Sequence, residues 1–182
     1  MTYKFIDLFA GIGGFRLALE SIGAKCVYSS EINRYSCATY EENFGDFPDG
    51  DITQKFAKDI PEHDILCAGF PCQPFSQASI PKYKSLGLKL GFEHETQGTL
   101  FHDICRILKY HKPKAFILEN VKHLKRHDGG KTWDTIVKSL RGLDYTVYDT
   151  VIDARKVVPQ HRERVFIVGF ADEIKFEWPE IE

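Results

Sequence analysis

One cysteine of this 182-residue chain is well suited to covalent chemistry. Cys72 follows the short apolar run 65–68, and the prolines on either side of it, Pro71 and Pro74, forbid helix there. A thiol on a stiff loop at the end of a strand is poorly placed for the core, so Cys72 is a candidate nucleophile. The other cysteines lie within strand or helix patterns and are interpreted as packing residues: Cys26, Cys37, Cys67 and Cys105.

A carboxylate follows another apolar run. Glu119 comes directly after the predicted strand 115–118. The carboxyl ends of parallel strands meet at one edge of a sheet, where ligands bind, so Glu119 is expected close to the turn after Gly69. A structural ion pair with Lys122 is the competing interpretation.

Two arginines enter the last predicted strand. Arg162 and Arg164 are alternate residues before the run 165–170, so their side chains are expected to point the same way. Two fixed guanidinium groups could hold a base carbonyl and a phosphate. The alternative is a solvated edge with Glu163 between them.

The glycine-rich turn Phe9-Ala10-Gly11-Ile12-Gly13-Gly14 joins a predicted strand to a helix. Glycines let the backbone approach a ligand closely, and a helix N-terminus favours a carboxylate or phosphate. A plain tight turn is the alternative. Glu31, at the end of the second predicted strand, can accept hydrogen bonds from both hydroxyls of a ribose, so the two features together indicate an adenosine-bearing cofactor. Asp51 is either a helix N-cap or a partner for an adenine amino group.

Strand and helix patterns alternate along the whole chain, which predicts an α/β fold with a mainly parallel sheet. The polar stretch 77–97 is interpreted as a functional loop. The expected strands are 4–9, 26–30, 65–68, 115–118, 145–152 and 165–170, and the expected helices are 15–22, 34–44, 100–108 and 133–140.

Composition excludes several classes of protein. The net charge is −2, with 43% hydrophobic and 27% charged residues, which is typical of one folded domain and lends no support to a strongly basic nucleic-acid binder. No apolar run is long enough to span a bilayer and no secretory leader is evident, so a cytoplasmic location and no membrane partner are expected. The cysteines form no CxxC pair, and only His123 and His127 approach a ligand spacing, so no metal is expected.

Taken in order, these motifs resemble those of the DNA cytosine C5-methyltransferases, particularly the bacterial kind that accompanies type II restriction endonucleases. The resemblance covers nearly the whole chain. The residues that carry it are Asp7-Leu8-Phe9-Ala10-Gly11-Ile12-Gly13-Gly14, Glu31, Gly50-Asp51-Ile52, Gly69-Phe70-Pro71-Cys72-Gln73-Pro74-Phe75-Ser76, Gly98-Thr99-Leu100-Phe101, Glu119-Asn120-Val121 and Gln160-His161-Arg162-Glu163-Arg164.

The resemblance implies a Rossmann-like methyltransferase fold, with helices on both faces of the sheet, and S-adenosyl-L-methionine as the methyl donor. Glu31 would bind the ribose hydroxyls, Ile32 would pack on the adenine, and Asp51 would complete the adenine site. The other residues implied to surround the cofactor are Phe9, Gly11, Ile12, Gly13, Gly14, Ile52, Pro71 and Leu100.

The resemblance also implies the chemistry. Cys72 would attack C6 of a cytosine flipped out of duplex DNA, which makes C5 nucleophilic enough to accept the methyl group. Glu119 would hydrogen-bond N3 and the exocyclic amine, Arg164 would hold O2, and Arg162 would support the site.

The expected domain is 1–182, a methyltransferase catalytic domain without the target-recognition domain and last motifs of the family. Double-stranded DNA is the expected partner, with a second chain carrying the recognition domain as a further one. Three alternatives stay open: a tRNA cytosine-5 methyltransferase, which usually carries a Cys-Phe-Thr signature not seen here; a non-catalytic fragment or subunit; and a dinucleotide-dependent oxidoreductase, disfavoured by the glycine spacing.

Overall fold

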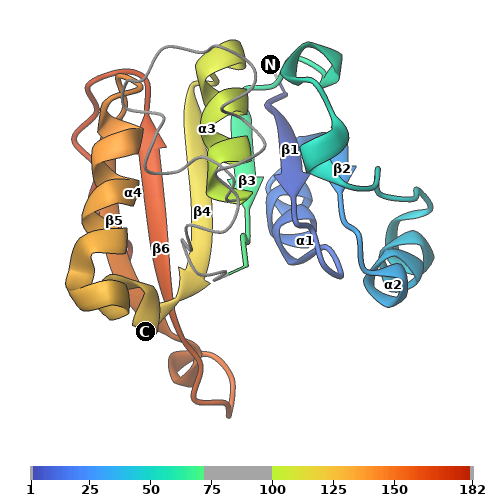
Figure 1. The fold of residues 1–182 in the computed structure, drawn as a ribbon. Coiled ribbons are helices and arrows are strands. Elements are labelled where there is room, and N and C mark those ends of the chain that lie inside the picture. Colours follow the sequence, from blue (N-terminus) through green and yellow to red (C-terminus); the bar gives the residue numbers. More distant parts are fainter. Residues whose placement is uncertain (1, 72–99, 181–182) are drawn as a thin grey trace.

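The protein forms a sheet of six strands in the order β2-β1-β3-β4-β6-β5 (Figure 1). The computed structural model describes residues 2–71 and 100–180. The strands are β1 (Lys4–Leu8), β2 (Lys25–Ser30), β3 (Ile65–Ala68), β4 (Ala115–Val121), β5 (Thr146–Asp153) and β6 (Glu163–Phe170), and the α-helices are α1 (Gly14–Ser21), α2 (Arg34–Phe44), α3 (Leu100–His111) and α4 (Lys131–Arg141).

The sheet is parallel on one side and antiparallel on the other. β1 pairs in parallel with β2 and β3, and β3 with β4, whereas β6 runs antiparallel between β4 and β5. The start of β6 therefore lies at the edge where β1, β3 and β4 end, which is the lower edge in Figure 1. This edge is called the carboxyl edge below.

The expected strand 115–118 was too short. β4 continues to Val121, because its ladder with β6 extends through the pair Asn120 with Val165 to Val121 with Arg164. Glu119 is therefore a residue within a strand, opposite Phe166, and not the residue that follows one.

Helices pack on both faces of the sheet. The larger core lies between the sheet and the helices α3 and α4, with Leu66, Phe116 and Leu118 facing Ile104 and Leu108, all of them buried. A smaller cluster on the opposite face joins α1 to the sheet; its buried members are Phe5, Leu19 and Cys67.

Local signals explain the bounds of α2, which match the predicted range 34–44. The Asn33 side chain accepts hydrogen bonds from the amides of Tyr35 and Ser36 and so caps the first turn. Gly45 ends the helix with φ 77°, a left-handed conformation that favours glycine.

No helix in the described part of the chain is long and apolar enough to cross a membrane. The described cysteines are free thiols, and Cys37 and Cys67 are buried, as expected of packing residues. Burial raises the pKa of the Cys67 thiol well above its usual range and that of Cys105 to about 12, so neither is suited to act as a thiolate. The candidate nucleophile Cys72 lies outside the described residues, as does the predicted loop 77–97.

Candidate functional site

The turn from β1 to α1 is built from alternating left-handed residues. Phe9, Gly11 and Gly13 have φ of 56°, 57° and 91°. Such alternation turns successive backbone amides toward one side and forms a concave surface that suits an anionic or polar ligand. A Cβ added to Gly13 would lie 2.1 Å from the Phe44 ring, so this position also needs glycine for close packing against α2.

Glu31 binds this turn directly. One carboxylate oxygen accepts the Gly11 amide at 2.8 Å, and the other accepts the amides of Ile32 at 2.9 Å and Asn33 at 2.8 Å. A carboxylate has about four acceptor positions, so three are in use. Glu31 is half-buried, and it holds the turn and the end of β2 at a fixed separation.

The segment 49–52 completes this end of the sheet. The Glu31 amide donates to the Asp49 carbonyl at 2.9 Å. This hydrogen bond holds the segment with Asp51 next to the end of β2. The Asp51 carboxylate accepts the Thr53 amide at 2.9 Å and caps the short helix Ile52–Gln54, so the N-cap interpretation is confirmed.

An ion pair joins the two halves of the sheet at the carboxyl edge. Arg164 Nε lies 2.8 Å from the nearer oxygen of Glu119, and the two side chains are 21% and 23% exposed. The other Glu119 oxygen faces Gly69, 3.8 Å from the position that a Cβ would occupy. Glu119 thus pairs with Arg164, and the alternative pairing with Lys122 is wrong, since Lys122 binds Glu163 at 2.6 Å.

The chain leaving β3 is fixed against the same strand. The Asn120 side chain donates to the Phe70 carbonyl at 2.8 Å, and both residues are buried. Pro71 follows as an exposed residue, and Cys72 is next in the sequence. The motif Glu119-Asn120-Val121 does not by itself reveal this role of Asn120; an amide side chain next to Glu119 is the one sequence signal for it.

An open pocket of about 790 Å³ lies beside the ion pair. Arg162, just before β6, and Arg164 both line it, but Glu163 between them does so too, so the expectation that the two arginines point the same way stays a prediction. The pocket has an excess of positive charge, because Glu163 is the only carboxylate among its lining residues. The other charged or ionisable residues of the lining are Lys122, His123, Lys125, Arg126 and His161.

The remaining predicted cofactor residues differ in exposure. Ile12 and Ile32 are 60% and 74% exposed, so their apolar side chains are open to a ligand. Ile52 is 2% exposed and packs in the larger core, which leaves its side chain little surface for an adenine. Gly14 is exposed, and Leu100 is half-buried at the start of α3.

A buried acid lies beneath the turn. Asp7 is fully buried in β1, and burial raises its pKa to about 7. Neither of its oxygens accepts a hydrogen bond of ordinary geometry within the described residues. The backbone amide and the positive charge of Arg16 lower the pKa of Asp7, but by less than burial raises it. The sequence analysis did not single out Asp7 as a titrating group, because only the fold shows its burial.

The turn and Glu31 together indicate the general type of enzyme. A glycine-rich turn tied to an acidic residue at the end of β2 is typical of α/β enzymes that bind a nucleoside-containing cofactor. Residues 3–182 match the sequence profile of the C-5 cytosine-specific DNA methylases. The chain belongs to this family.

Two bacterial relatives match almost the whole chain. It is 55% identical over 170 residues to the type II methyltransferase M1.ScrFI of Lactococcus lactis subsp. cremoris, covering 92% of this chain and 41% of that protein. It is 54% identical over 178 residues to the type II methyltransferase M.HaeII of Haemophilus aegyptius, covering 97% and 53%. The chain therefore spans about half the length of these relatives.

A solved structure agrees on the fold. The S. pombe Dnmt2 methyltransferase superposes with a TM-score of 0.72 at 21% sequence identity, covering 97% of this chain and 51% of that one. The Rossmann-like α/β methyltransferase fold expected from the sequence is confirmed.

Proposed function

We propose that this chain is the catalytic portion of a DNA cytosine-5 methyltransferase that uses S-adenosyl-L-methionine and belongs to a restriction-modification system. The observation that carries the proposal is the Glu119–Arg164 ion pair beside Gly69 and Phe70, at the same sheet edge as the glycine turn. A cytosine bound at this pair would find a carboxyl group for N3 and the exocyclic amine and a guanidinium group for the O2 carbonyl.

The residues at the turn fit the proposed cofactor. Glu31 is half-buried and retains one acceptor position, so it can bind one ribose hydroxyl as it stands and a second by exchanging the Gly11 amide. Ile12 and Ile32 would cover the adenosine portion, and Asp51 has a carboxylate oxygen for the adenine amine. S-adenosyl-L-methionine would supply the methyl group when bound there.

The chemistry would proceed through Cys72. Its thiolate forms a bond to cytosine C6, and the electron pair of the C5–C6 double bond moves to C5. Glu119 shares a proton with N3 and accepts from the exocyclic amine, which stabilises the ring as charge develops. Once C5 carries the methyl group, a base or water removes the C5 proton, the C–H electron pair re-forms the C5–C6 double bond, and the Cys72 thiolate is expelled. Arg164 holds O2 and keeps Glu119 oriented throughout.

The basic pocket suits a DNA backbone. Lys122, Lys125, Arg126 and Arg162 line it, and phosphates could approach the Glu119–Arg164 ion pair from solvent there. Lys122 and Lys125 already pair with Glu163 and Asp149, so Arg126 and Arg162 would make the main phosphate contacts. Reading of the DNA sequence and many further phosphate contacts would come from a recognition domain in the same or a second chain. A DNA substrate of this kind would place the protein in the bacterial cytoplasm.

Transfer of a labelled methyl group tests the proposal. Purified protein is incubated with labelled S-adenosyl-L-methionine and duplex DNA of mixed sequence, beside a tRNA sample and the Cys72→Ser variant. Label in DNA that disappears in the variant supports the proposal. Label in tRNA alone would assign the tRNA alternative, and bound cofactor without transfer to either would favour the non-catalytic alternative.

A further inference from the structure

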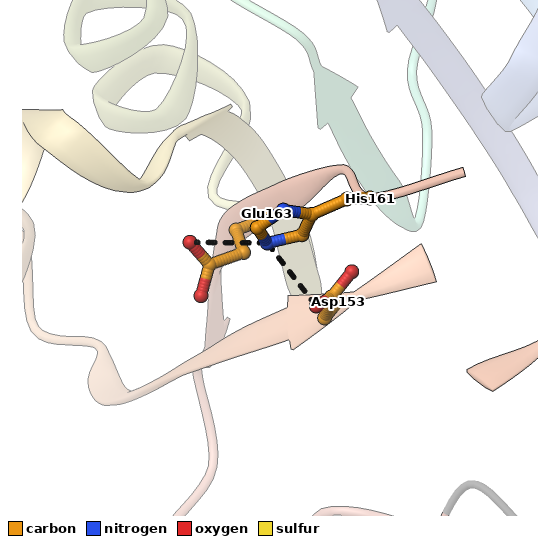
Figure 2. A group of neighbouring side chains, drawn as sticks. All are labelled: Asp153, His161 and Glu163. Atoms are coloured by element: carbon orange, nitrogen blue, oxygen red, sulfur yellow. Dashed lines mark ion pairs between the residues drawn. The ribbon is translucent and has the colours of Figure 1, made fainter. Parts of the chain in front are cut away.

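Three side chains with metal-binding atoms meet at the base of the β5–β6 connection (Figure 2). Asp153 ends β5, Glu163 begins β6, and His161 lies just before it. His161 Nε2 is 3.4 Å from the nearer Asp153 oxygen and 3.7 Å from the nearer Glu163 oxygen. All three donor atoms lie within 4.8 Å of one another.

These separations suit a small transition-metal ion. Zinc bonds to nitrogen and oxygen of about 2.0–2.2 Å place tetrahedral neighbours roughly 3.3–3.6 Å apart. Both contacts of His161 fall close to this range. A modest rotation of the Glu163 side chain would bring its oxygen within the same range of the Asp153 oxygen. A ring nitrogen with two carboxylates is also a donor set that binds zinc and similar ions.

A bound cation would stabilise the ladder at this point more than the surface ion pairs that it already has. Asp153 and Glu163 are directly opposed in the β5–β6 register, and like charges in that position destabilise a sheet. Their partners in the described residues are exposed: the Arg155 side chain on Asp153 is 63% exposed and the Lys122 side chain on Glu163 is 48% exposed. Exposed pairs of this kind contribute little, so a bound ion can displace them.

The Asp153 carboxylate is held in place by the backbone. Its second oxygen accepts the amides of Arg155 at 3.1 Å and Arg162 at 3.3 Å. Such contacts orient a ligand before a metal binds and raise its affinity. The remaining coordination positions would be open to water, because His161 is exposed.

We propose that Asp153, His161 and Glu163 form a binding site for one zinc-type divalent ion. The sequence analysis expected no metal because it considered the spacing of histidines, whereas this site combines one histidine with carboxylates that only the ladder brings together. A bound ion would tie the end of β5 to the start of β6 and so fix the connection that carries Arg162. None of the three ligands is a proposed cofactor or cytosine residue, although His161 and Glu163 line the same pocket as Arg162 and Arg164. The proposal holds whether or not the chain transfers methyl groups.

Zinc titration by calorimetry, at a pH where histidine is neutral, tests the site. The His161→Gln variant is compared with wild type and with His123→Gln, a matched change in the same pocket outside the ligand set. We expect one ion bound per chain through this site, affinity at least about tenfold weaker in His161→Gln, and no change in His123→Gln. Equal zinc binding by all three proteins, or no saturable binding by wild type, would overturn the proposal.

Cobalt substitution identifies the ligands independently. A site of nitrogen and oxygen donors gives cobalt(II) d–d absorption without a thiolate-to-metal band, and this signal should be absent from His161→Gln and from Glu163→Gln. A thiolate band that persists in both variants would assign the metal to cysteines and would contradict the site.

Discussion

Glu119 and Arg164 are distant in sequence, and the antiparallel pairing of β4 with β6 brings them together. Both side chains are mostly buried, so their mutual orientation is more fixed than that of an exposed pair. The second Glu119 oxygen is left toward Gly69, where a proton could pass to a bound base. We regard this pair as the centre of the site.

Replacing Glu119 with Gln tests its role in chemistry. The variant keeps the shape of the side chain but loses the charge that pairs with Arg164, so the rate of methyl transfer is expected to fall at least about 100-fold. Binding of S-adenosyl-L-methionine, measured by calorimetry, should stay within about twofold. Glu173→Gln, an exposed change in the C-terminal segment, is the matched control and should leave both unchanged. A fall of similar size in the control would refute a specific role.

The raised pKa of Asp7 leads us to expect that the stability of the protein falls as the pH rises toward 7. The pKa of Asp7 is raised from 3.8 to about 7 by burial, so the folded chain holds this proton more tightly than the unfolded chain. The contribution of Asp7 to stability is therefore fully present below about pH 4 and is lost as the pH rises to about 7.

Asp7→Asn removes this dependence, because an amide has no proton to lose there. The stability of the variant relative to wild type should rise by about 2–3 kcal/mol between about pH 5 and pH 8. Urea unfolding of both proteins at the two pH values measures it. A difference that does not change with pH would show that the carboxyl group does not titrate in this range.

At the scale of elements, α1 and α2 support the glycine turn together. Arg16 on α1 forms an ion pair with Asp46, donates to the Tyr40 hydroxyl at 3.2 Å, and lies 4.5 Å from the centre of the Phe44 ring. The same ring covers Gly13. The turn therefore packs directly against α2.

Gly13→Ala should disturb the packing of the turn against α2. The new methyl group would overlap the Phe44 ring, and its backbone φ of 91° is unfavourable for alanine, so we expect a loss of at least about 2 kcal/mol of stability and weaker cofactor binding. Gly50→Ala is the control, since nothing lies within 4 Å of the added atom and its φ is not in the left-handed range. Thermal unfolding with and without S-adenosyl-L-methionine compares them. Equal stability of the two variants would contradict this description of the turn.

The α2 cap offers a smaller test of an element. Asn33→Ala leaves the amides of Tyr35 and Ser36 without their acceptor and should cost about 1 kcal/mol. Asn43→Ala, an exposed change near the end of the same helix, should cost little. Denaturant unfolding distinguishes them, and an equal cost at both positions would mean that the cap contributes nothing.

The sequence predicted elements well where the signal was local. The strand 65–68 and the helix 34–44 were predicted with the observed bounds, because an apolar run and a cap with a C-terminal glycine define them. The end of β4 was missed, since polar Glu119 and Asn120 resemble a strand end until β6 pairs with them. The partner of Glu119 depended on the same non-local pairing, as did the meeting of Asp153 with Glu163.

At the scale of the whole molecule, the net charge of −2 conceals an uneven distribution. Cations gather in one pocket at the carboxyl edge, beside the Glu119–Arg164 ion pair. Composition therefore argues against a strongly basic nucleic-acid binder, whereas the fold gathers cations locally in one pocket. The overall composition does not show this clustering, because the cationic residues come from two separate segments, around residues 121–126 and 160–164.

Arg126 tests whether this surface contacts phosphates. Arg126→Gln should weaken DNA binding by a similar factor for all sequences and reduce the slope of log affinity against log salt concentration by about 1. Arg141→Gln, an exposed change at the C-terminal end of α4 and outside the pocket lining, is the control and should change neither. Fluorescence anisotropy at several salt concentrations provides the comparison. An unchanged slope in Arg126→Gln would place the DNA elsewhere.

Covalent capture with duplex DNA of mixed sequence that contains 5-fluorocytosine tests the proposed role of Cys72 directly. Fluorine at C5 cannot leave as a proton, so an adduct formed by thiolate attack on C6 stays bound to the protein once C5 is methylated. We expect an adduct that requires S-adenosyl-L-methionine and maps by mass spectrometry to Cys72. An adduct at another cysteine, or none in a preparation that methylates ordinary DNA, would contradict this role.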